Sequence, residues 1–172
     1  MKKLISVTLV SILVIGCFSF STLAVNESEI EVKAKAAVLM DTSTGEVLYS
    51  FNENEKLYPA SVTKIMPLLL FMEALDSGKI ALTDTVTTSP TAAGKGGSQI
   101  WLKEGETMAV DELLRATAIG SANDACTAVG EHLAGSETGF VKMMNDRARE
   151  LGMVNTNFVN CSGLDDDTTE HL

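Results

Sequence analysis

The residues Tyr-Pro-Ala-Ser-Val-Thr-Lys-Ile-Met at positions 58–66 decide how this chain is interpreted. Within this stretch Ser61 and Lys64 form an S-x-x-K pattern at the point where helical spacing begins. Side chains three residues apart lie on one face of a helix, so these two are predicted to meet. A serine hydroxyl becomes a good nucleophile when a neighbouring base takes its proton, and a lysine kept neutral by burial is such a base. The N–H groups at the helix start, including that of Ser61, can stabilise an oxyanion.

The same two residues also have an ordinary interpretation. Ser61 can cap a helix while Lys64 extends into water. An S-x-x-K pattern is common in proteins, so it has little weight alone. The order and context of further motifs must decide between the two interpretations.

A second pattern, S-x-N, lies at residues 121–123 in a predicted tight turn between helices. There the hydroxyl of Ser121 can relay a proton, and the amide of Asn123 can orient a substrate amide and Lys64. The ordinary alternative is that one of the two caps a helix. The pattern also occurs at residues 50–52, so it too needs context.

Hydrophobic periodicity predicts an α+β domain. A buried strand at 36–40, a turn at 41–45 and a strand at 46–50 form a hairpin, and a further short strand is expected at 83–88. Helical spacing covers 60–76, where the interior Pro67 predicts a kink one turn after Lys64. Three more helices are predicted at 111–119, 122–133 and 140–151.

Composition excludes several classes of function. The 172 residues are 45% hydrophobic and 21% charged, which is typical of a globular protein. The net charge of −10 leaves no electrostatic footprint for nucleic acid. The glycine-rich residues 94–97 lack the G-K-[ST] ending of a phosphate-binding loop. His132 and His171 are isolated, so we predict no metal site and no cofactor.

The first 24 residues are predicted to be a signal peptide. Two lysines precede an apolar run that ends in small residues, with Ala24 as the expected last residue removed. A membrane anchor is the alternative, because the run approaches spanning length. A lipoprotein-type sequence ending at Cys17 offers a second alternative. Residues 25–172 then form the folded part, in which Cys126 and Cys161 can pair outside the cytoplasm or remain buried thiols.

Taken together, the motifs resemble those of the penicillin-recognising serine enzymes, whose set is S-x-x-K, S-x-N and K-[ST]-G. The residues around Ser61 are similar to the nucleophile segment of the low-molecular-mass D-alanyl-D-alanine carboxypeptidases, the peptidase S11 family. The resemblance covers residues 33–172, because the remaining segments follow in the family's order. These are the hairpin at 37–48, Gly97-Ser98 before Trp101-Leu102, residues 119–125, and Gly152 followed by Asn157-Phe158 and Ser162-Gly163-Leu164.

The resemblance implies a DD-peptidase, or transpeptidase-like, fold in which an antiparallel sheet packs with a helical subdomain. It also implies a serine carboxypeptidase that removes the terminal D-alanine from peptidoglycan pentapeptides ending in D-Ala-D-Ala. Ser61 is the implied acyl-ester nucleophile, Lys64 the general base, Ser121 the proton relay and Asn123 a substrate-binding residue. β-Lactams are the implied covalent inhibitors, and the implied location is extracytoplasmic, with membrane contact only through regions outside this sequence.

The sequence departs from the family pattern in one respect. It contains no K-[ST]-G, the strand motif that binds the substrate carboxylate in the family, so the sequence is expected to be an N-terminal portion without the C-terminal strands. Two alternatives follow. A class A-like β-lactamase needs a deacylating glutamate, usually in E-x-x-x-N, and that pattern is absent from the sequence. A non-catalytic relic that binds wall peptide or β-lactam is the other.

Overall fold

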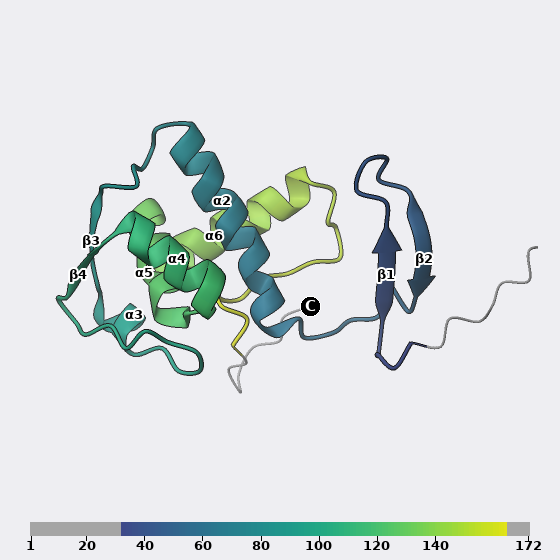
Figure 1. Cartoon of the computed structure of the whole chain (residues 1–172), viewed down its shortest axis with the longest axis horizontal. Coiled ribbons are helices and arrows are strands. Elements are labelled where there is room, and N and C mark those ends of the chain that lie inside the picture. The colour runs from purple at the N-terminus through teal and green to yellow at the C-terminus, as the bar shows by residue number, and fades with distance from the viewer. Residues whose placement is uncertain (1–31, 165–172) are drawn as a thin grey trace, which may run out of the picture. The chain divides into compact units, whose positions relative to one another are not determined.

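The computed structural model describes residues 32–164, which fall into two compact units (Figure 1). The first unit extends to Glu53 and the second begins at Asn54. The predicted signal peptide at 1–24, with Cys17, lies outside the described residues, and so does His171. The described chain combines helices with two small antiparallel sheets, so the predicted α+β class is confirmed.

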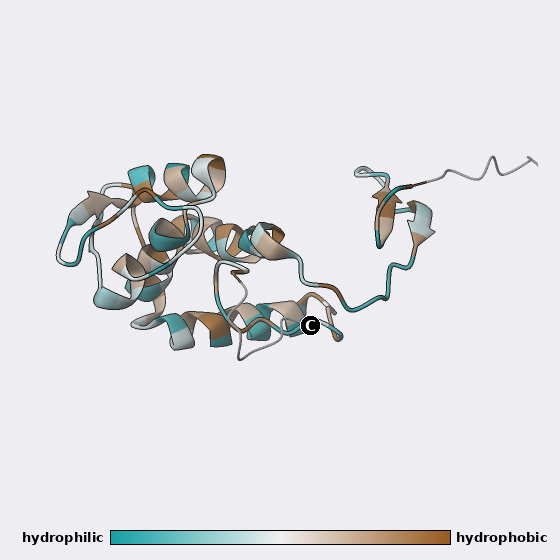
Figure 2. Ribbon diagram, turned by 90° about the horizontal axis from the view of Figure 1, so that it is seen from below, coloured by the Kyte–Doolittle hydropathy of each residue, from teal (hydrophilic) through white to brown (hydrophobic). Residues whose placement is uncertain are grey.

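The first unit is the predicted hairpin. Strand β1 (Ala37–Met40) pairs antiparallel with β2 (Val47–Phe51), and a bulge shifts the register between Leu39 and Met40. The expectation that the first strand is buried is wrong for the described residues, because Val38, Leu39 and Met40 are all exposed. Figure 2 shows hydrophobic residues along the hairpin. Alternating β geometry explains the exposure, since two strands have two faces and residues 32–53, the described part of this unit, contain no layer that covers either.

The turn of this hairpin is organised by the carboxylate of Asp41. Its Oδ1 accepts hydrogen bonds from the backbone N–H groups of Ser43 and Thr44 at 2.8 and 2.9 Å, and from the Ser43 hydroxyl at 2.6 Å. Gly45 closes the turn with φ of 74°, in the left-handed region. The hydrogen bonds, first of all that from the Ser43 hydroxyl, lower the pKa of Asp41 to about 2.

The second unit holds the helices. In chain order its elements are the 3₁₀ helix η1 (Ala60–Lys64), α2 (Ile65–Asp76), β3 (Thr85–Thr87), α3 (Pro90–Ala93), β4 (Thr107–Ala109), α4 (Val110–Gly120), α5 (Asn123–Ala134) and α6 (Glu137–Glu150). The predicted strand and helices are confirmed with small shifts in their ends. Strand β4 was not predicted, because three residues between a turn and a helix carry no readable alternation.

Helix α5 lies at the centre of this unit. Every residue from Asn123 to Gly130 is buried, and the helix contacts α2, α3, α4, α6 and β3. Its sequence is rich in small residues, which allows close packing on all sides. Gly130 shows how close, since a Cβ there would lie 2.6 Å from the ring of Phe140 on α6. That ring stacks on Phe71 of α2 with centroids 5.1 Å apart.

Pro67 does not kink a continuous helix, contrary to the prediction. The chain forms a 3₁₀ helix up to Lys64, and α2 begins at Ile65. Pro67 is therefore the third residue of α2, inside the first turn, where a proline is tolerated. The change from 3₁₀ to α geometry explains how the S-x-x-K turn and the proline coexist.

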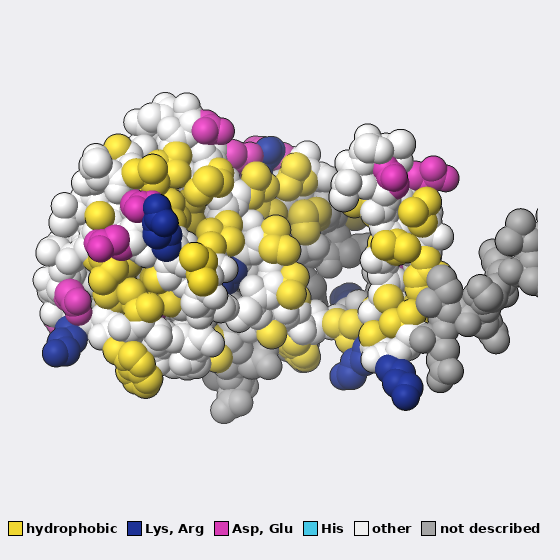
Figure 3. Space-filling view, viewed as in Figure 1, with side chains coloured by type: hydrophobic (Ala, Val, Ile, Leu, Met, Phe, Trp, Pro, Cys, Tyr) yellow, Lys and Arg dark blue, Asp and Glu magenta, His cyan; other side chains and the backbone are white. Residues whose placement is uncertain are grey.

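Within residues 32–164, no helix is long and apolar enough to cross a membrane. Hydrophobic side chains nevertheless reach the surface of the helical unit, as the space-filling view shows (Figure 3). Among them, Val62 lies within the S-x-x-K turn, Ile65 directly follows it, and Ile119 is near the end of α4. These exposed side chains surround the segments that carry the conspicuous motifs.

Truncating the stacked ring in the core tests this packing. We expect Phe140→Ala to lower the free energy of unfolding by about 3–5 kcal/mol, because it removes a fully buried ring and leaves a cavity. Urea denaturation followed by circular dichroism measures the change. Val154→Ala, at a side chain that is 81% exposed, is the control and should change stability by less than about 0.5 kcal/mol. Equal effects of the two substitutions would contradict the assigned core.

Candidate active site

The side chains of Ser61 and Lys64 meet, as their spacing predicts. The Nζ of Lys64 lies 3.1 Å from the Oγ of Ser61, which accepts its hydrogen bond. Both belong to η1, and in a 3₁₀ helix residues three apart lie directly above one another. Ser61 is exposed, whereas Lys64 is only 3% exposed. The arrangement presents a hydroxyl to solvent with an amine immediately behind it.

Burial changes the acid–base behaviour of Lys64. Removal from water lowers the pKa of its ammonium group from the ordinary value of 10.5, since a charged amine loses hydration there. Nearby Cys126 and Cys161 act in the opposite direction and are smaller causes. Salt-bridge partners are absent for Lys64 among residues 32–164. A lysine in these surroundings is closer to the neutral form that can accept a proton.

The second partner of Lys64 comes from a distant part of the chain. Its Nζ donates to the backbone carbonyl of Ser162 at 2.9 Å, across 98 positions of sequence. Asn160 shapes this segment, because its Oδ1 accepts hydrogen bonds from the N–H groups of Ser162 and Gly163 at 3.1 and 2.8 Å. This is the turn that asparagine side chains characteristically form. The carbonyl is thereby aimed at the amine.

Gly163 is required where this segment passes the start of η1. Its φ is 71°, and a Cβ there would lie 1.8 Å from the carbonyl oxygen of Ala60. Ala60, directly before Ser61, itself has φ of 48°. Left-handed backbone at an alanine is strained, and such strain gathers at functional sites. The close approach of the two segments therefore fixes the backbone around Ser61.

Asn123 lies at the start of α5 and is 3% exposed. Its Nδ2 donates to the carbonyl of Gly96 at 2.8 Å, and its backbone N–H donates to the carbonyl of Ser98 at 2.7 Å. Its Oδ1 has no hydrogen-bond partner among the described residues. Gly97, with φ of 72°, passes so close that a Cβ would meet the Asn123 amide at 2.8 Å. The glycine-rich loop thus packs directly against the side-chain amide of Asn123.

The carboxylate of Asp124 holds the next part of the same loop. It accepts hydrogen bonds from the N–H groups of Ile100 and Leu102, the second at 3.0 Å, and it is fully buried. Trp101, between those two residues, has φ of 65° and is 74% exposed. The carboxylate therefore stabilises an unfavourable backbone conformation that leaves an indole ring at the surface.

Ser121 occupies the turn between α4 and α5. It is the C-cap of α4, with φ of 55°, and its side chain is partly exposed. In the part of the chain that the structure describes, no hydrogen bond joins it to Ser61 or Lys64. The geometry thus brings Ser61 and Lys64 into contact and places Asn123 against Gly96. Ser121 lies in the turn between α4 and α5, without a hydrogen bond to either Ser61 or Lys64 among the described residues.

Three features of the candidate site could not be predicted from the spacing of residues in the sequence. These are the Ser162 carbonyl on Lys64, the turn made by Asn160 and the buried Asp124 carboxylate. A backbone carbonyl has no residue-type signal, so its role depends on the fold alone. Asn160 before Ser162-Gly163 is a turn signal in the sequence, but nothing there indicates that the turn returns to Lys64.

Comparison with known proteins identifies the family. Residues 23–171 match the family model described as "Peptidase_S11: D-alanyl-D-alanine carboxypeptidase". The chain belongs to this family. It is 50% identical over 171 residues to the D-alanyl-D-alanine carboxypeptidase DacF of Bacillus subtilis (strain 168), covering 97% of this chain and 44% of that protein.

Solved structures of similar proteins agree with this membership. The D-alanyl-D-alanine carboxypeptidase DacD from Francisella tularensis matches with a TM-score of 0.78 and 33% identity, covering 83% of this chain and 34% of that one. Penicillin-Binding Protein D2 from Listeria monocytogenes, solved in an ampicillin-bound form, matches with a TM-score of 0.72 and 30% identity, covering 83% and 57%. The carboxypeptidase-family fold predicted from the motifs is confirmed. The chain spans less than half the length of the curated relative.

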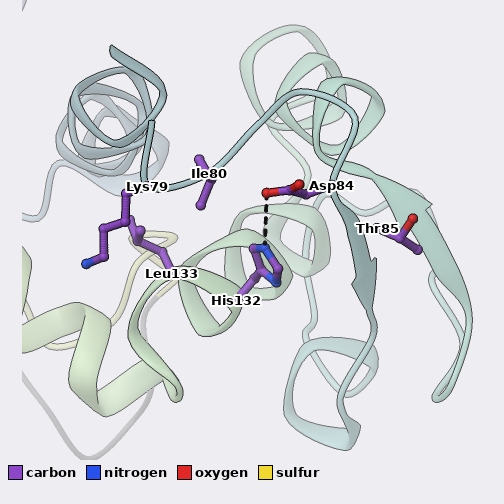
Figure 4. Close-up of a pocket in the computed structure, with 6 residues that line it drawn as sticks. All are labelled: Lys79, Ile80, Asp84, Thr85, His132 and Leu133. Carbon is purple, nitrogen blue, oxygen red and sulfur yellow. Dashed lines mark ion pairs between the residues drawn. The ribbon is translucent and has the colours of Figure 1, made fainter. Parts of the chain in front are cut away.

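A surface pocket elsewhere in this carboxypeptidase-family chain holds none of the motif residues. Its volume is about 580 Å³, and Figure 4 shows its lining, in which Nε2 of His132 lies 3.9 Å from Oδ2 of Asp84. The other lining residues are Lys79, Ile80, Thr85 and Leu133. The candidate site is therefore recognised by the contacts around Lys64 and not by the volume of a cavity.

Gly163→Ala tests the close approach of the two segments. We expect a loss of about 3 kcal/mol or more in the free energy of unfolding, because the new methyl overlaps the Ala60 carbonyl and the left-handed φ is unfavourable. Urea denaturation measures it. Gly152→Ala is the matched control, since Gly152 has φ of 78° with nothing within 4 Å, and it should cost about 1–2 kcal/mol. Similar losses of unfolding free energy in the two variants would show that Gly163 does not pass close to the Ala60 carbonyl.

The buried Lys64 predicts a pH dependence of stability. Between its lowered folded pKa and the unfolded value of 10.5, the unfolded chain binds more protons at this site. Its contribution to stability therefore rises with pH across this window, by up to about 1.4 kcal/mol per pH unit. We expect the unfolding free energy of the wild type to rise relative to that of Lys64→Met as the pH rises from neutral. Exposed Lys103→Met is the control, and a slope no steeper for Lys64 than for Lys103 would contradict the prediction.

Proposed function

We propose that this chain is the nucleophile-bearing portion of a serine D-Ala-D-Ala carboxypeptidase that trims peptidoglycan stem peptides. The observation that carries the proposal is the 3.1 Å contact between the exposed Ser61 hydroxyl and the buried Lys64 amine. Family membership indicates the reaction class. Because the chain covers only 44% of the Bacillus subtilis relative, the activity is proposed for the complete polypeptide.

In the proposed reaction, Lys64 removes the proton of Ser61 as the hydroxyl oxygen attacks the carbonyl of the penultimate D-alanine. The tetrahedral intermediate collapses with cleavage of the peptide bond, and the terminal D-alanine leaves with a proton delivered to its amine. An ester remains on Ser61 until water hydrolyses it and regenerates the hydroxyl. The amine of Lys64 is suited to the first step because burial lowers its pKa.

Two further residues have proposed roles in the same reaction. Asn123 has its Nδ2 committed to Gly96, while its buried Oδ1 is without a partner among the described residues, so that this oxygen can accept an N–H of the substrate. Ser121 lies in the turn between α4 and α5, two residues before Asn123, and is proposed to relay the proton between Lys64 and the leaving amine. The K-[ST]-G strand that binds the substrate carboxylate is assigned to the rest of the polypeptide.

The proposed location is outside the cytoplasm. The basic start and apolar run of residues 1–24 support export by a signal peptide, with cleavage after Ala24. Peptidoglycan lies outside the membrane, so the proposed substrate requires this location. β-Lactams are the proposed covalent inhibitors, because the similar Listeria monocytogenes protein is described in ampicillin-bound and cefotaxime-bound forms.

Covalent labelling tests the nucleophile. We expect a fluorescent penicillin to label the complete polypeptide at Ser61, and Ser61→Ala to abolish the label, because the ester cannot form without the hydroxyl. Gel fluorescence and mass spectrometry of the labelled peptide provide the measurement. Ser77→Ala, at an exposed serine just beyond the end of α2, is the matched control and should label normally.

The outcomes separate the competing functions. Labelling that survives in Ser61→Ala would falsify the assignment. Rapid loss of the label with hydrolysis of the penicillin would indicate a β-lactamase. Stable labelling without release of D-alanine from a pentapeptide would favour a binding protein without catalysis.

A further inference from the structure

Two buried cysteines lie against each other beside the Lys64 site. Cys126 is in α5, and its Sγ donates a hydrogen bond to the backbone carbonyl of Cys161 at 3.3 Å. The Sγ of Cys161 lies 3.3 Å from the hydroxyl of Thr127, the next residue of α5. Both cysteines are fully buried and both are free thiols. Thirty-five positions of sequence separate them, so the fold alone brings them together.

Hydrogen bonds and burial hold both thiols in place. A hydrogen bond with the Cys161 side chain, followed by burial, raises the pKa of the Cys126 thiol well above its ordinary value. On its other side the Cys161 thiol donates to Oε1 of Glu137 at 3.6 Å. Glu137 in turn forms an ion pair with Lys95 at 2.6 Å. Lys64 is the other charged group near the pair.

The position of Cys161 connects the pair to the candidate site. The next residue, Ser162, provides the carbonyl that accepts the hydrogen bond of Lys64 at 2.9 Å. A bond that holds Cys161 against α5 therefore also holds the Ser162 carbonyl, which accepts the hydrogen bond of the Lys64 amine. In the thiol form this attachment consists of weak hydrogen bonds to sulfur.

We propose that Cys126 and Cys161 form a disulfide when the protein folds in an oxidising compartment, and that this bond fastens residues 160–164 to α5 behind Lys64. The proposal rests on the proposed function only for the compartment, since exported proteins are the ones that form and keep disulfides. It names a covalent modification and a positioning role for Cys161, and it adds no step to the acyl transfer.

The chemistry needs a disulfide oxidant, such as oxidised glutathione. The thiolate of one cysteine attacks the oxidant and expels one thiol, leaving a mixed disulfide on the protein. The second cysteine then attacks the protein sulfur of that mixed disulfide, forms the Cys126–Cys161 bond and expels a second thiol. Two electrons and two protons pass to the oxidant. Because both sulfurs are buried in the folded chain, exchange occurs before residues 160–164 close over α5, and the finished bond is shielded from reductants.

Mass spectrometry tests the bond without any assay of activity. The complete polypeptide is refolded with either dithiothreitol or a mixture of reduced and oxidised glutathione, then denatured, alkylated with iodoacetamide and digested with trypsin without reduction. We expect the glutathione sample to contain the 116–142 peptide joined to the peptide that begins at Glu150, and the dithiothreitol sample to contain both alkylated. Two alkylated cysteines in the glutathione sample, or a bond from either one to another partner, would overturn the proposal.

Thermal inactivation tests the positioning role. We expect the oxidised protein to retain penicillin labelling to a midpoint about 5 °C or more above that of the reduced protein, because the bond restrains a segment that otherwise opens. The double variant Cys126→Ala/Cys161→Ala should have one midpoint under both conditions. Equal midpoints for the two forms of the wild type would overturn the role. If the protein does not label at all, circular dichroism melting gives the same comparison, so failure of the proposed function leaves this test intact.

Discussion

The hydrogen bond from Lys64 to the carbonyl of Ser162 is the interaction on which the site depends. It joins the first helical turn of the second unit to a loop near the end of the described chain. A buried ammonium group is costly unless its donors are satisfied, and this carbonyl and the Ser61 hydroxyl provide two of the three acceptors. The same burial that makes the residue costly also lowers its pKa. Burial of Lys64 is therefore the cause both of its cost to stability and of the lowered pKa that suits its proposed role as a base.

Helix α5 allows this arrangement because its side chains are small. Alanine, glycine, cysteine and threonine let neighbouring helices approach on every side, and the helix remains buried from Asn123 to Gly130. Its first residues project toward the glycine-rich loop, where Asn123 and Asp124 accept or donate hydrogen bonds to four loop residues. A little further along, Cys126 contacts Cys161. One central helix thus positions both the Asn123 amide and the cysteine that contacts the segment next to Lys64.

Backbone strain is concentrated at the same place. Ala60 and Ser121 have positive φ, and each lies within two residues of a motif side chain. Gly97 and Gly163 also have positive φ, and they allow the loop and the 160–164 segment to pass within contact distance of Asn123 and Ala60. Local conformations of this kind persist only where surrounding packing enforces them. Stability of the helical core is therefore a condition for the geometry around Ser61.

The sequence by itself determined the α+β class, the hairpin, the positions of the main helices and the contact of Ser61 with Lys64. Each of these is a short-range property, set by hydrophobic spacing or by residues one turn apart. It was wrong about the burial of the first strand and about Pro67, because exposure depends on which layers cover a strand and helix starts depend on local turn type.

Only the tertiary structure decided that Lys64 is buried, that its acceptor is the Ser162 carbonyl, that Asp124 holds the Trp101 turn and that Cys126 meets Cys161. These contacts join residues 22 to 98 positions apart. Spacing in a sequence constrains neighbours within a few turns, whereas pairing across such distances depends on how the whole core packs. The proposed nucleophile Ser61 and its proposed base Lys64 are local features of the sequence, and the surroundings that change the pKa of Lys64 are products of the fold.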